Sequence, residues 1–185
     1  MHKTLTSALL AAALLVLCRN CPAHNEKGRL SPHETIKATL EGDEISITYG
    51  RPYTKDPNSG QSRQIWGGLV PFGKVWRLGA DEATLLTTRQ SIQINGKTIP
   101  AGTYSLFLLP GSKTDAQLIV NKQTGQWGTK YDETQDLVRV PVKGEALSAP
   151  VEQLNITIEQ NTGGSGALKI AWEKTAYSAE IRVQR

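Results

Sequence analysis

The stretch SIQINGKTIPAGTYSLFLLP, residues 91–110, decides the fold class of this chain. Its Asn95-Gly96 pair stands between two short alternating segments and is the strongest short-range signal for a two-residue type I′ turn. Pro100, Ala101 and Gly102 then turn the chain into a run that is apolar on both faces. Such a run is typical of a central strand that is covered on both sides. The stretch therefore predicts a hairpin followed by the middle of a β-sheet.

The chain on the N-terminal side of this stretch alternates in the same way. Ser31 to Glu34 spells a helix capping box, Ser-Pro-His-Glu. Residues 36–40 nevertheless alternate at period two, and Gly42-Asp43 predicts a tight turn into a second alternating run at 45–49. We therefore expect a hairpin here and not a helix.

On the C-terminal side the alternation continues to the end of the chain. No window from residue 30 onward sustains a helical period, so the chain is predicted to be all-β. The expected further strands are AQLIVNK (116–122), DLVRVPV (136–142), VEQLNITIE (151–159), ALKIAWE (167–173) and YSAEIRV (177–183), with turns at NTGGSG (161–166) and at Lys174-Thr175. About ten short strands predict an antiparallel β-sandwich or jelly-roll-like fold.

The first 23 residues are predicted to be a signal peptide, which leaves residues 24–185 as one β-sandwich domain. Lys3 is followed by an apolar run from Leu5 to Leu17, too short to span a bilayer comfortably. Small residues at 21–23 favour cleavage before His24 and a secreted or periplasmic protein. The alternative is an imperfect lipobox ending at Cys18, which would then carry lipid and anchor the protein in the envelope.

Composition excludes several classes of function for the mature chain. Both cysteines precede residue 24, so disulfides, thiolate catalysis and zinc-thiolate sites are not expected. Loss of Lys3 and Arg19 with the leader lowers the formal charge from +4 by two, to +2. Without a basic cluster, this charge does not predict a nucleic-acid partner.

Five motifs are similar to those of a known family. They are YGRP (49–52), IWGGLVPFGKVWRLGADEAT (65–84), PAGTYSLF (100–107), VNKQTGQWG (120–128) and DLVRV (136–140). In this order they resemble the exported bacterial family catalogued as domain of unknown function 2911, over residues 31–183. The resemblance implies a secreted or lipid-anchored protein, in a family that has no generally accepted activity. The chain departs from the family pattern at His33, where an arginine is usual, and at Asp81, where an amide is usual. An ionised carboxylate at residue 81 cannot donate a hydrogen bond.

The stretch 65–84 holds the charged residues of greatest interest. It is expected to form strands and turns whose tryptophans fill a sheet corner. Asp81 and Glu82 are adjacent, so on a strand they would point to opposite faces and could not flank one bond together. We expect Glu82 to pair with Arg77 or Arg51, and a general acid or base role for Glu82 is the weaker alternative.

Arginines and tryptophans suggest ligand recognition more than catalysis. Arg51 precedes Pro52, Arg77 follows Trp76, and Arg63 lies three residues before Trp66. This setting suits binding of an anion but equally the locking of loops. Trp66 and Trp127 are each followed by glycine and are expected to be exposed, whereas Trp172 lies in an alternating strand and is expected in the core.

Metal and nucleophile chemistry have little support in the sequence. His24 and His33 are the two histidines left after the leader, and Asp56 to Gly60 predicts an Asx-type turn and not a calcium loop. There is no Gly-x-Ser-x-Gly motif. No cofactor is therefore expected.

These observations predict a non-catalytic binding module for an envelope glycan, peptide or partner protein. The alternatives are an envelope hydrolase that uses Glu82, and a purely structural envelope protein. The predicted ligand-binding residues are Arg51, Trp66, Arg77, Asp81, Glu82, Lys122 and Trp127.

Overall fold

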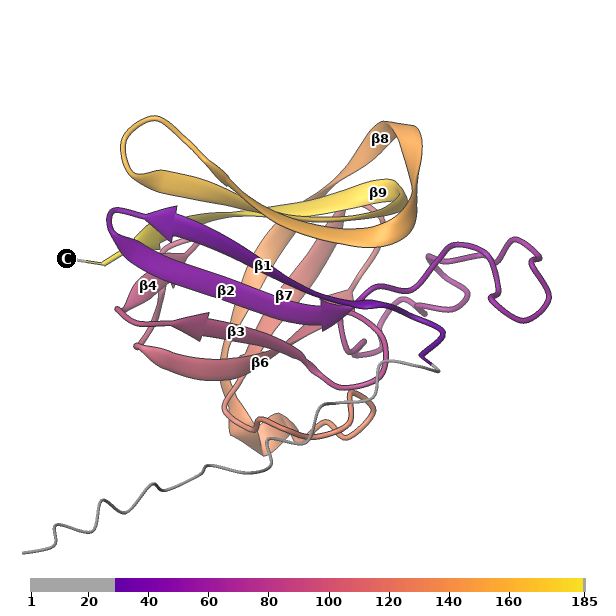
Figure 1. Ribbon diagram of the computed structural model, residues 1–185, viewed down its shortest axis with the longest axis horizontal. Helices are drawn as coiled ribbons and strands as arrows, with labels where there is room; N and C mark the ends of the chain where they lie inside the picture. Colours follow the sequence, from indigo (N-terminus) through magenta and orange to yellow (C-terminus); the bar gives the residue numbers. More distant parts are fainter. Residues whose placement is uncertain (1–28, 185) are drawn as a thin grey trace, which may run out of the picture.

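A computed structural model of the chain describes residues 29–184 (Figure 1). The predicted signal peptide, its cleavage site and Cys18 lie outside the described residues. Within 29–184, no helix is long and apolar enough to cross a membrane.

The described residues form one antiparallel sheet, so the all-β prediction is confirmed. The strand order is β1-β2-β3-β6-β7-β8-β9-β4-β5. The strands are β1 (His33–Leu40), β2 (Asp43–Gly50), β3 (Thr84–Thr88), β4 (Ile92–Ile94), β5 (Lys97–Ile99), β6 (Gly102–Pro110), β7 (Asp115–Asn121), β8 (Asp136–Gln160) and β9 (Ser165–Val183). A 3-10 turn, η1 (Glu133–Gln135), precedes β8.

Both predicted hairpins are present. At the turn between β4 and β5, Asn95 and Gly96 have φ angles of 45° and 76°, as a type I′ turn requires. The β1–β2 turn lies one residue earlier than predicted, because Glu41 and Gly42 are its two central residues, with φ angles of 48° and 85°.

Strand β6 is central and covered on both faces, as its sequence predicts. It pairs with β3 on one side and with β7 on the other. Leu106 and Leu108 belong to the main core, whereas Phe107 points to a smaller cluster with Ile119 on the opposite face.

The C-terminal half has two long bent strands in place of four short ones. The turn predicted at Lys174-Thr175 is wrong, because both residues lie inside β9. Register shifts at Val151 and the positive φ of Glu173, 53°, mark bulges in the β8–β9 ladder. A bulge bends a strand without ending it, so alternation breaks there while the strand continues. Figure 1 shows the resulting hairpin arching over β1.

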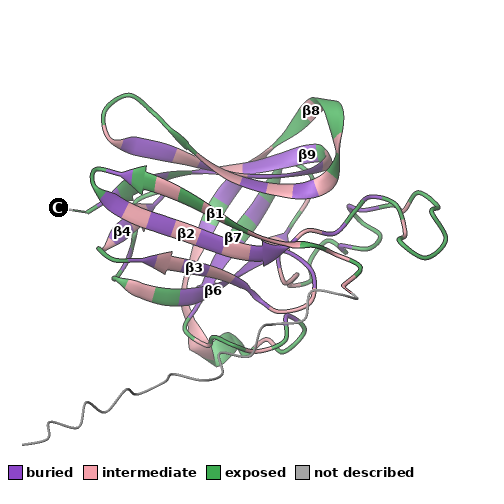
Figure 2. Ribbon diagram, viewed as in Figure 1, coloured by how far each residue is buried: buried purple, intermediate pink, exposed green. Residues whose placement is uncertain are grey.

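The sheet curls so that its two ends face the β8–β9 hairpin, which is consistent with the predicted sandwich. Strand β1 contacts β8 and β9, and β5 contacts β8. Buried residues alternate along the strands and enclose the core (Figure 2). Tyr49 links the layers: its hydroxyl accepts from the Ile156 amide at 2.9 Å and donates to Glu34 at 3.1 Å.

The stretch 65–84 is a loop, so the prediction of strands before Thr84 is wrong. It contacts the sheet through an isolated bridge from Trp76 to Leu108 and through single hydrogen bonds from the Gly73 and Ala80 amides, and it contacts the loop 122–132 through a bridge from Glu82 to Trp127. Positive φ angles at Gly67 and Gly73 break the strand geometry. Its tryptophans do fill the corner of the sheet, as expected. The loop thus carries its charged residues at the end of the sheet where the site lies.

Candidate functional site

Two neighbouring cavities lie beside the loop 51–83. The larger one lies where this loop meets the N-terminal segment and the loop 122–132, and the smaller one lies between Arg29, strands β1 to β3 and Glu82. The larger has a volume of about 580 Å³ and the smaller about 280 Å³. The larger volume is within the range of small-molecule sites. Residues on the walls of the larger cavity include Tyr53, Arg63, Trp76, Arg77, Asp81, Tyr131 and Trp172.

Arg77 is held on the wall of the larger cavity by packing and not by charge. Its stem lies over Gly128, where an added Cβ would be 2.5 Å from the Arg77 Cδ. The Gly128 amide donates to the Asp81 carbonyl at 2.9 Å, which fixes the two loops together. Within residues 29–184, the Arg77 guanidinium makes no hydrogen bond or ion pair. A half-buried cation without a partner favours an anionic ligand.

Two further N–H groups on these walls have no acceptor among the described residues. The Arg63 Nε and the Trp172 Nε1 are both buried. Trp172 is fully buried and stacks on Trp76, with ring centroids 5.6 Å apart and planes 15° from parallel. Trp66 supports the stack from behind, where its Nε1 donates to the Trp172 carbonyl at 3.1 Å. Buried donors normally have partners, so these two are unsatisfied groups that lie beneath the cavity surface and out of direct reach of a ligand.

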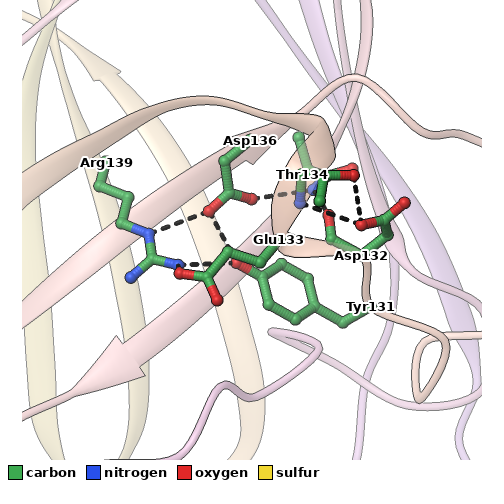
Figure 3. Close-up of polar contacts among 7 residues, drawn as sticks. Tyr131, Asp132, Glu133, Thr134, Asp136 and Arg139 are labelled. Carbon is green, nitrogen blue, oxygen red and sulfur yellow. Dashed lines mark hydrogen bonds and ion pairs between the residues drawn. The ribbon is translucent and has the colours of Figure 1, made fainter.

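A polar network fixes Tyr131, which also lines the larger cavity (Figure 3). The Tyr131 hydroxyl donates to Asp136 at 2.7 Å and accepts from Arg139 at 3.0 Å. Burial, followed by the bond to Asp136, raises the pKa of Tyr131 to about 12. Its ring packs on Phe107, with centroids 4.9 Å apart. Tyr131 therefore presents a fixed aromatic edge and keeps its proton at physiological pH.

An ion pair stands at the rim of the smaller cavity. Both terminal nitrogens of Arg29 donate hydrogen bonds to the Glu82 carboxylate, at 2.6 and 2.8 Å. The His33 Nε2 lies 3.0 Å from the same carboxylate. The hydrogen bonds from Arg29 lower the pKa of Glu82 to about 2, against the opposing effect of desolvation. The predicted pairing of Glu82 with Arg77 or Arg51 is wrong, because Arg29 takes that place.

The same residues include a set of potential metal ligands. His33, Asp81 and Glu82 each offer one ligand atom within 4.8 Å of the others. The Arg29 guanidinium already binds Glu82 and lies 3.8 Å from the Asp81 carboxylate. Because a cation would have to displace this positive charge, the geometry favours an ion pair over a metal centre.

The loop predicted at Asp56 to Gly60 is the expected Asx-type turn. The Asp56 Oδ1 accepts from the amides of Asn58 and Ser59 at 2.9 Å each. These bonds, the Ser59 amide first, lower the pKa of Asp56. The turn orders one side of the larger cavity.

The structure brings together part of the predicted site. Arg77 and Asp81 line the larger cavity, and Glu82 lines the smaller one beside it. Trp127 is 47 % exposed, as expected, and its backbone bridges to Glu82. Lys122 is exposed and lines neither of these two cavities.

The other two predicted residues are structural. Trp66 is 3 % exposed, so its predicted exposure is wrong, because the glycines after it let the loop fold back over the indole. Arg51 pairs with Glu34 at 3.0 Å and donates its Nε to the Leu154 carbonyl at 3.0 Å. Trp172 is in the core, as predicted.

Sequence reasoning did not identify several residues that line the two cavities. Arg29 precedes the first strand and has no local motif, and Tyr131 reaches the site through contacts distant in the sequence. Trp172 follows a core pattern, and nothing in that pattern indicates that its Nε1 lacks a partner. Arg77 could be predicted as a binding residue, because it stands beside Trp76 in a glycine-rich segment.

Comparison with known proteins places the chain in a family. No curated protein and no solved structure matches it. The model of the family described as "Protein of unknown function (DUF2911)" matches residues 31–181, which hold both cavities except for Arg29 and Leu30. This chain belongs to the DUF2911 family of proteins of unknown function.

Proposed function

We propose that this protein is an exported, non-catalytic binding module that holds a small ligand in the larger cavity. The observation that supports the proposal is a cavity lined by Trp76 and by Arg77, whose guanidinium has no partner within the described residues. Aromatic walls and a few fixed polar groups are the usual composition of ligand sites. Among the predicted ligand classes, a glycan suits a cavity of this kind better than a partner protein, which would need an extended surface.

The chemistry of Glu82 does not favour the alternative of a hydrolase. A general acid must hold a proton at working pH, and a pKa of about 2 leaves this carboxyl ionised. A general base gains strength from a higher pKa, so the pair with Arg29 also weakens that function. A purely structural protein is the remaining alternative and is an outcome of the test below.

The test is a thermal-shift screen of the protein against envelope glycans, peptides and organic anions. A compound at a hundred times its dissociation constant is expected to raise Tm by roughly 5 to 10 °C. Thr129 is exposed on the cavity wall, so Thr129→Trp is expected to fill the cavity and remove the shift. The matched control is Thr162→Trp, in an exposed turn away from the cavity. Shifts that survive Thr129→Trp, or no shift with any compound, would contradict the proposal.

A further inference from the structure

The chemistry of the cavity walls points to a more specific ligand. We propose that the larger cavity binds an acidic sugar, with its carboxylate on Arg77 and its ring beside Trp76. This inference rests on the proposed function and names the ligand class of the same site.

The carboxylate is assigned from the Arg77 guanidinium, which has no partner within the described residues. The Arg77 guanidinium offers a planar fork that matches a carboxylate in a bidentate pair. It has no ion-pair partner within the described residues, whereas Arg29, Arg51 and Arg139 each have a carboxylate within 3.0 Å. Two carboxylates also line the cavity: the Asp56 Oδ1 accepts hydrogen bonds within its turn, and the Asp81 Oδ2 is buried 3.8 Å from the Arg29 guanidinium.

The sugar ring is assigned from the rest of the lining. Trp76 is half-buried and is backed by the stacked Trp172, so it is a rigid apolar surface. The side chains of Ser31, Asn58 and Thr129 line the cavity and make no hydrogen bond within the described residues. Hydroxyl and amide groups of this kind can pair with a ligand that carries many hydroxyls, which a simple aromatic acid lacks.

The test is isothermal titration of the protein with D-glucuronate, D-glucose and acetate. D-Glucuronate is expected to bind at least tenfold more tightly than either of the others, because it alone has both ring and carboxylate. Arg77→Gln is expected to weaken D-glucuronate at least tenfold, since a charged hydrogen bond is lost. Arg89→Gln removes an exposed arginine elsewhere and is expected to change the affinity less than twofold.

A second variant guards against misfolding, because the Arg77 stem packs on Gly128. Arg77→Lys keeps a stem and a charge but loses the fork, so it is expected to keep Tm and still weaken D-glucuronate several-fold. Equal affinity for D-glucose and D-glucuronate, or unchanged affinity in both Arg77 variants, would overturn the inference. If D-glucuronate fails but Thr129→Trp still blocks a compound from the screen, the inference fails and the binding function stands. If nothing binds in the cavity, both fail.

Discussion

Glu82 keeps its negative charge because Arg29 donates two hydrogen bonds to it. Its folded pKa of about 2 lies below the ordinary value of 4.5. The pair therefore stabilises the fold fully above about pH 4.5, and this stability is lost as the pH falls from 4.5 through 2. The side chain is 36 % exposed, so solvent screens much of the effect.

Glu82→Gln is expected to lower the free energy of unfolding by about 1 kcal/mol at pH 7. The difference in the free energy of unfolding between this variant and the wild type should shrink as the pH falls from 4.5 towards 2, because the wild-type carboxyl then becomes neutral, as the glutamine is at every pH. Urea denaturation at several pH values measures this. Glu44→Gln is the control, because Glu44 pairs with the exposed Lys37 and should change stability by less than about 0.5 kcal/mol. A difference that stays constant across this pH range would contradict the assignment.

Gly128 is the residue on which the position of Arg77 depends. An added Cβ would lie 2.8 Å from the Arg77 Cβ and 2.9 Å from the Asp81 carbonyl oxygen. Gly128→Ala is therefore expected to lower the free energy of unfolding by about 1 to 3 kcal/mol and to weaken any ligand bound by Arg77. Chemical denaturation and the titration above measure the two effects. Wild-type stability and affinity would show that Arg77 is placed by something else.

At the scale of elements, the β8–β9 hairpin arches over β1 because its two strands bend without ending (Figure 1). Glu173 stands at the bend with a φ of 53°, opposite Val151. Side chains are strained in this left-handed region, and β-branched residues most of all.

Glu173→Val is accordingly expected to lower the free energy of unfolding by about 1 kcal/mol, although valine usually favours strands. Ser178→Val, at a regular half-buried position of the same strand, is the matched control and should be neutral or stabilising. Urea denaturation compares the two. If both valines have the same effect, the backbone at Glu173 is not strained.

Period-two alternation was enough to predict most of these elements. It located β1, β2, β4 to β7 and the two halves of β8 and β9, and it identified β6 as central. It failed at Lys174-Thr175, because a bulge and a turn both interrupt alternation and only tertiary pairing separates them. It also missed β3, whose five residues follow the charged pair Asp81-Glu82 without a turn signal of their own.

At the scale of the whole molecule, the loops 51–83 and 122–132 meet at one end of the curled sheet and leave the two cavities there. Sequence reasoning placed Arg77, Asp81 and Glu82 near each other because they are close in the chain. It could not place Arg29 or Tyr131. Arg29 is held by Glu82, which is 53 residues away in the sequence, and Tyr131 is held by packing on Phe107. Such contacts form only when the chain has folded into the curled sheet.

The most direct test of the ligand site is a nitrogen-15 spectrum of the four tryptophan indole groups during titration with D-glucuronate. We predict that the Trp76 and Trp172 signals move, with smaller changes at Trp66, which lies behind the stack. Trp127 is exposed outside the larger cavity and should stay in place. Movement of the Trp127 signal alone, or no movement of any of the four, would contradict a ligand site in the larger cavity.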